Sequence, residues 1–151
     1  MRHINKVIIH CSDSDHKHHD DISVIRRWHV EENRWTDIGY HYFIKKNGQV
    51  QEGRPLSRFG AHAKGYNHES IGICLHGRNN FTKEQFASMN KLCSLLMCDF
   101  NLTDSNFFGH NDVSDKTCPN FDVKKKLSLQ ECSLIQLPKI VKELNITTPK
   151  I

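Results

Sequence analysis

Apolar residues recur along this 151-residue chain with two different periods, and the periods separate expected strands from expected helices. β-branched and aromatic runs bounded by turn residues are typical of strands. The pair Asn47-Gly48 between two such runs predicts a β-hairpin with a two-residue turn. The expected strands cover residues 6–11, 35–46, 49–54, 71–77 and 107–109.

Helical periodicity predicts two longer helices and two short ones. Asp20 or Asp21 can cap the first, which begins near Ile22, and its apolar stripe favours packing in a core over stacking on a sugar. Thr82 and Gln85 form a capping box at the start of the second, the most strongly patterned helix. The expected helices cover residues 22–33, 82–99, 123–127 and 138–144, and a frayed end covers residues 147–151.

Length and composition predict one domain with a real hydrophobic core. Residues are 37% hydrophobic and 25% charged, and no internal repeat is found. The net charge of +4 suits an acidic partner such as a cell-wall polymer, a membrane surface or a nucleic acid, without choosing among them. No stretch of about twenty apolar residues exists, which argues against a transmembrane helix. The first ten residues lack a signal-peptide core, so we expect a cytoplasmic location before the protein acts.

The six cysteines show no paired spacing of the kind that small secreted domains use. In the cytoplasm we expect them to be reduced, and five of the six to be structural, mostly buried thiols. The sixth is Cys118, which lies in the polar stretch of residues 109–119 together with His110 and Lys116. Imidazole and thiolate are ligands that zinc prefers, but a catalytic site takes three protein ligands.

Several other histidines are candidates for the third ligand, and the pattern alone leaves their roles open. His10 ends the first expected strand, where a functional role and a backbone-capping role are about equally supported. The histidines of residues 16–19 favour a solvated loop. Tyr40 and His41 alternate along an expected strand, so both cannot face one cleft unless the strand begins after Tyr40. The long polar connection over residues 54–70 is typical of functional or disordered loops.

Laid end to end, five segments resemble the zinc-dependent N-acetylmuramoyl-L-alanine amidases. The match is to the single-domain phage lysozymes of the T-odd podophage kind, which share their fold with animal peptidoglycan recognition proteins. No single motif is decisive, but five in family order with their spacing kept are very specific. The matching segments are residues 8–12, 35–41, 60–67, 70–73 and 110–122.

The resemblance implies an α/β fold with a central mixed β-sheet flanked by helices, and a cleft that holds one Zn²⁺. It implies a single domain over residues 1–151, with a core at about 5–128 and an extra tail at 129–151. The implied site residues are zinc ligands His10, His110 and Cys118, catalytic Tyr40 and Lys116, and a cleft-lining, substrate-binding His62. Tyr40, and not His41, is then expected to face the cleft.

The implied activity is that of a phage-type endolysin, hydrolysing the amide bond between N-acetylmuramic acid and L-alanine in peptidoglycan. The protein would be a monomer, held in the host cytoplasm until lysis and then acting on the cell wall. The main alternative is a non-catalytic peptidoglycan-binding module of the same fold, and some phage relatives also bind a phage RNA polymerase. A thiol hydrolase with Cys118 as nucleophile and His110 as base would resist chelators. A zinc-stabilised nucleic-acid module ranks last, because its paired ligand spacings are missing.

Overall fold

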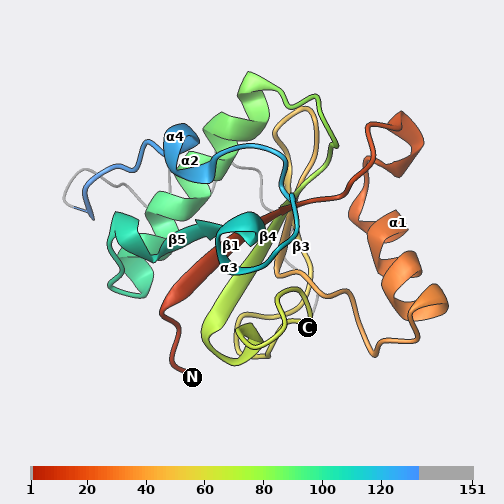
Figure 1. The fold of residues 1–151 in the computed structure, drawn as a ribbon, viewed down its shortest axis with the longest axis horizontal. Coiled ribbons are helices and arrows are strands. Elements are labelled where there is room, and N and C mark those ends of the chain that lie inside the picture. Colours follow the sequence, from red (N-terminus) through yellow and green to blue (C-terminus); the bar gives the residue numbers. More distant parts are fainter. Residues whose placement is uncertain (1, 133–151) are drawn as a thin grey trace.

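A five-stranded mixed β-sheet forms the centre of the computed structural model, which describes residues 2–132 (Figure 1). The sheet order is β3-β2-β4-β1-β5, in which β1 pairs in parallel with β4 and β5, β2 is parallel to β4, and β3 is antiparallel to β2. The strands are β1 (Lys6–Cys11), β2 (Tyr42–Ile44), β3 (Val50–Glu52), β4 (Ser70–Leu75) and β5 (Phe107–Gly109). The predicted fold class, a mixed sheet flanked by helices, is confirmed.

The two longer helices form where the apolar periodicity places them. The side chain of Asp21, and not of Asp20, caps α1, while Thr82 and Gln85 make the predicted capping box of α2. The expected helix at 138–144 and the expected frayed end at 147–151 lie outside the described residues. The helices are α1 (Ile22–Arg27), continued by the π-helical η2 (Trp28–Glu32), then α2 (Lys83–Asp99), α3 (His110–Val113) and α4 (Val123–Lys126), with short 3₁₀ turns η1 (Lys17–His19), η3 (Asn67–Glu69) and η4 (Asp104–Asn106).

The two faces of the sheet carry different kinds of side chain because successive residues of a strand point to opposite sides. On one face, Val7 and Ile9 of β1 pack with Leu92 of α2 in the larger core. On the other face, Phe43 of β2 packs with Ile25 of α1. No helix among residues 2–132 is long and apolar enough to cross a membrane.

The β2–β3 hairpin is confirmed, but its predicted two-residue turn is wrong. The amide of Gly48 donates to the carbonyl of Lys45 at 2.8 Å, and Lys45 pairs with Gln49, which leaves a three-residue loop. Gly48 has φ of +89°, whereas Asn47 has an ordinary negative φ. A tight turn followed by a left-handed glycine is the common alternative for three-residue hairpin loops.

The chain beyond α4 lies along α2, and this contact explains a disulfide that the sequence analysis missed. Asn90 Oδ1 accepts from the amide of Ser128 at 2.7 Å, and Ser94 Oγ accepts from the amide of Gln130 at 2.9 Å. Four residues further along α2 and two further along the extended segment, Cys98 and Cys132 form a disulfide with their Cα atoms 5.5 Å apart. Four helical residues rise about 6 Å and two extended residues about 6.6 Å, so the two sets of positions stay matched. The expectation that all these thiols are reduced is therefore wrong for this pair.

Candidate active site

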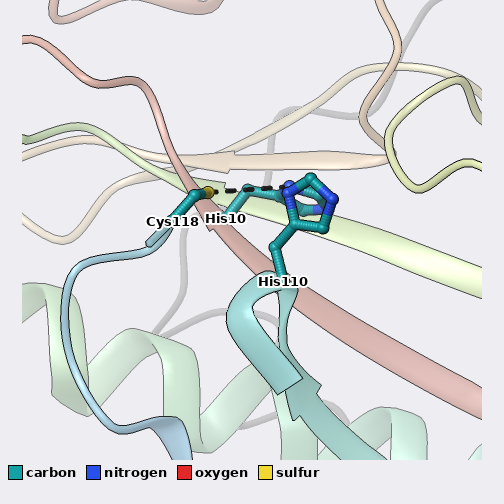
Figure 2. A group of neighbouring side chains, drawn as sticks. All are labelled: His10, His110 and Cys118. Atoms are coloured by element: carbon teal, nitrogen blue, oxygen red, sulfur yellow. Dashed lines mark hydrogen bonds between the residues drawn. The ribbon is translucent and has the colours of Figure 1, made fainter. Parts of the chain in front are cut away.

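Three side chains that are distant in sequence meet at the carboxyl end of β1 and β5. Figure 2 shows His10 on β1, His110 at the start of α3, and Cys118 on the loop after α3, with their side chains converging. Ile9 of β1 pairs with Gly109 of β5 in the parallel register. The next residues, His10 and His110, therefore lie side by side at the same end of the sheet. One potential ligand atom from each of the three lies within 4.8 Å of the others, and Cys118 Sγ is 3.9 Å from His10 Nδ1.

The separation of the Cys118 sulfur and the nearby His10 nitrogen suits a tetrahedral zinc ion. Zn–S and Zn–N bonds of about 2.3 and 2.05 Å at a tetrahedral angle put sulfur and nitrogen about 3.6 Å apart. The observed 3.9 Å between Cys118 Sγ and His10 Nδ1 is close to that value. Two imidazoles and one thiolate also form a donor set that zinc accepts, and three protein ligands leave one position open.

The electrostatic surroundings keep both histidines in the form that binds a metal. Burial lowers the pKa of His10 well below its ordinary value, and the neighbouring His62 and His110 lower it further. Burial and the charge of Lys116 lower the pKa of His110. Both rings are therefore neutral at pH 7 and can offer a lone pair without first losing a proton.

Cys118 is held by its neighbour Cys11. The amide of Cys11 donates to Cys118 Sγ at 3.3 Å. A hydrogen bond with the Cys11 thiol, followed by burial, raises the pKa of Cys118. Cys118 is thus a protonated thiol at pH 7 in the metal-free protein, and it would lose that proton on binding a metal.

The three residues open onto a cleft of about 1020 Å³ on the sheet face opposite α2. Its walls are the loop before β4 and the loop after α3. Sequence reasoning did not single out Trp35, Tyr66 or Asn67, all of which line this cleft. Asn67 Oδ1 accepts from the amides of His62 and Ala63 at 2.9 and 3.0 Å, which fixes the loop that carries His62. An asparagine inside a long glycine-containing loop was the available signal.

Tyr40 lines the cleft and His41 does not, because β2 begins only at Tyr42. The Tyr40 ring lies 5.1 Å from the His10 ring, centroid to centroid. Burial, followed by the thiol of Cys74, raises the pKa of the Tyr40 phenol well above its ordinary value, so it remains a proton donor. His41 points the other way: its Nδ1 accepts from the amide of Gly72 at 3.0 Å, and its Nε2 donates to the carbonyl of Arg58 at 2.9 Å.

Lys116 lies on the exposed rim of the cleft, two residues before Cys118. Its backbone amide donates to Ser114 Oγ at 3.2 Å, and Ser114 Oγ donates to the carbonyl of His110 at 2.8 Å. Asp112 caps the start of α3, where its Oδ2 accepts from the amide of Gly109 at 2.8 Å. The cleft thus combines a set of metal-ligand side chains, a protonated phenol and an exposed lysine on one rim.

His62 lines the cleft but is also tied to a candidate ligand. Its Nδ1 lies 2.8 Å from His10 Nε2, and its Nε2 lies 3.2 Å from Ser70 Oγ. Both ring nitrogens of His62 already have partners within the protein. No observation tests the predicted substrate contact by His62, which stays a prediction.

Comparison with known proteins bears on the identity of this cleft. Residues 1–121 match the family model described as N-acetylmuramoyl-L-alanine amidase. An endolysin of Enterobacteria phage T3 is 39% identical over 127 residues, which cover 79% of this chain and 82% of that protein. The solved endolysin amidase LysCS from Clostridium intestinale superposes with a TM-score of 0.72 at 26% identity, covering 97% of this chain and 86% of that one.

A second solved structure, Drosophila PGRP-LB, superposes with a TM-score of 0.68 at 28% identity, covering 79% of this chain and 76% of that one. The family model spans β1 through the loop that carries Cys118, and therefore includes every residue of the cleft named above. The chain thus belongs to the N-acetylmuramoyl-L-alanine amidase family and is an amidase of the phage endolysin type.

Proposed function

We propose that this amidase depends on one Zn²⁺ held by His10, His110 and Cys118, and that it cuts the bond between N-acetylmuramic acid and L-alanine of peptidoglycan. The observation that carries the proposal is the convergence of these three donors within 4.8 Å at the floor of the cleft. When bound there, Zn²⁺ supplies Lewis acidity, which activates water for attack and polarises a carbonyl oxygen.

The remaining steps fall to side chains of the cleft. The lactyl carbonyl of the substrate gains negative charge during attack, and the ammonium of Lys116 on the rim is placed to offset it. A well-placed donor of this kind contributes about 3–4 kcal/mol in other hydrolases. The Tyr40 phenol keeps its proton at neutral pH and can donate a hydrogen bond at the reacting centre or pass a proton toward the leaving amine.

The observed geometry disfavours a thiol hydrolase. A nucleophilic cysteine needs a lowered pKa, yet the hydrogen bond with Cys11 and burial raise the pKa of Cys118. Cys118 Sγ lies 3.9 Å from His10 Nδ1, and within residues 2–132 no hydrogen bond joins Cys118 to His110, the base that a thiol hydrolase would need. A non-catalytic peptidoglycan-binding module would have no need of the complete ligand set.

Chelation and zinc add-back on purified peptidoglycan test this proposal. We expect wild-type protein stripped of metal to release no new amino termini, and stoichiometric Zn²⁺ to restore release. Cys118→Ala should stay inactive after zinc is added, while Cys93→Ala, at a buried cysteine on α2 away from the cleft, serves as the control and should retain activity. Full activity of metal-free wild type, or of Cys118→Ala, would contradict the proposal.

A further inference from the structure

A chain of hydrogen bonds runs from the candidate ligand His10 into the protein, and His62 is its middle member. His10 Nε2 and His62 Nδ1 are 2.8 Å apart, and His62 Nε2 and Ser70 Oγ are 3.2 Å apart. The His10 and His62 rings meet edge to face, with an interplanar angle of 89°. This edge-on approach aims a nitrogen of one ring at a nitrogen of the other.

The two hydrogen bonds select one arrangement of protons. His10 Nδ1 faces Cys118 Sγ at 3.9 Å, so Nδ1 is the atom directed at the ligand site. A neutral ring with a free Nδ1 carries its proton on Nε2, which then donates to His62 Nδ1. His62 in turn carries its proton on Nε2 and donates to Ser70 Oγ. Each ring thereby satisfies both of its nitrogens.

The sheet beneath His62 is shaped to receive its ring. A Cβ atom on Gly72 of β4 would lie 2.6 Å from Cγ and Cδ2 of His62 and 2.8 Å from its Nδ1. Only a residue without a side chain leaves room for the imidazole there. Asn67 holds the backbone on either side of the ring through the amides of His62 and Ala63. The ring is therefore fixed from below by the strand and from behind by the loop.

We propose that His62 is a positioning residue that fixes the tautomer and orientation of His10 and so sets the metal affinity of the site. This inference rests on the proposed zinc site. Partners that hold the second nitrogen of a ligating histidine typically change metal affinity about 10–100-fold when they are removed.

Zinc affinity of the purified protein, measured by competition with a chromophoric chelator, tests the role of His62 without using activity. We expect His62→Leu to bind Zn²⁺ about 10–100-fold more weakly than wild type. His62→Asn, whose Oδ1 can occupy the acceptor position of Nδ1, should recover most of the loss. His68→Leu, at an exposed histidine on the same loop, is the matched control and should leave affinity unchanged.

The outcomes separate this inference from the proposed function. Should wild type bind zinc tightly while His62→Leu binds it equally well, the positioning role is refuted and the zinc site survives. If wild type fails to bind zinc at all, both fall. Should His62→Leu not fold, Ser70→Ala serves instead, because it removes only the hydrogen bond between His62 Nε2 and Ser70 Oγ. We then expect a several-fold weaker zinc affinity and a shifted absorption spectrum of the Co²⁺-loaded protein. An unchanged affinity and spectrum would overturn the positioning role of His62.

Discussion

Gly72→Ala offers a quantitative test of how the cleft is built. The new methyl group would lie 2.6 Å from two carbon atoms of the His62 ring, so the ring must move by about 1 Å to reach ordinary contact. Overpacking of this kind costs about 1–3 kcal/mol. The displaced ring also loses its hydrogen bond to His10, a further 0.5–1.5 kcal/mol approximately. We therefore expect the free energy of unfolding to fall by about 1.5–4.5 kcal/mol.

A double-mutant cycle isolates the cause of that loss. In the His62→Ala background the ring is gone, so Gly72→Ala should cost less than about 1 kcal/mol, because alanine is otherwise no worse than glycine in a strand. Urea unfolding of the four metal-free proteins measures both costs. A Gly72→Ala penalty that is the same in both backgrounds would refute the reasoning, since the methyl group would then be clashing with something other than His62.

Three further predictions address catalysis, the disulfide and pH dependence. Tyr40→Phe and Lys116→Ala should each bind zinc as wild type does but lose about 10²–10³-fold in turnover on purified peptidoglycan, and wild-type rates would remove either assignment. Cys132→Ser opens a 34-residue loop and should lower the free energy of unfolding by about 4 kcal/mol in non-reducing buffer, with no difference once dithiothreitol is present; a stability gap that persists in reductant would argue against the bond. Burial lowers the pKa of His41 from 6.5 to about 4, so between these values the unfolded chain binds a proton that the folded protein does not. The stability that the neutral, buried His41 contributes is complete above pH 6.5 and is lost as pH falls. Between pH 7.5 and 4.5, the free energy of unfolding should therefore drop about 2.5 kcal/mol less in metal-free His41→Asn than in metal-free wild type. Equal drops in the two proteins would contradict this assignment.

The features that sequence patterns predict are those that local chemistry determines. The strand β1 follows from a β-branched run, and α2 from a capping box and an apolar stripe, and both form within a residue or two of their expected bounds. The proposed zinc ligands could be named only through family resemblance, because spacing alone left His10 equally suited to capping a strand. The structure shows why it is a ligand candidate: β1 and β5 lie side by side in register.

Other features depend on contacts that no local pattern encodes. The disulfide follows from the match between a helix face at Asn90, Ser94 and Cys98 and an extended segment at residues 128–132, which becomes visible only once the chain has turned back along α2. The packing of the His62 ring over Gly72 also could not be predicted from a local pattern, because His62 lies on a loop and Gly72 on a strand. From the sequence alone, a glycine in a strand predicts only that another group approaches the backbone closely at that position.

The identity of the bond that is cut tests the central claim most directly. Mass spectrometry of peptidoglycan digested by the zinc-loaded protein should show stem peptides with a free amino group on L-alanine and glycan strands whose N-acetylmuramic acid carries a free lactyl carboxylate. Protein with Cys118→Ala should produce neither. Fragments cut within the glycan or within the stem peptide, with the lactyl amide intact, would contradict the account.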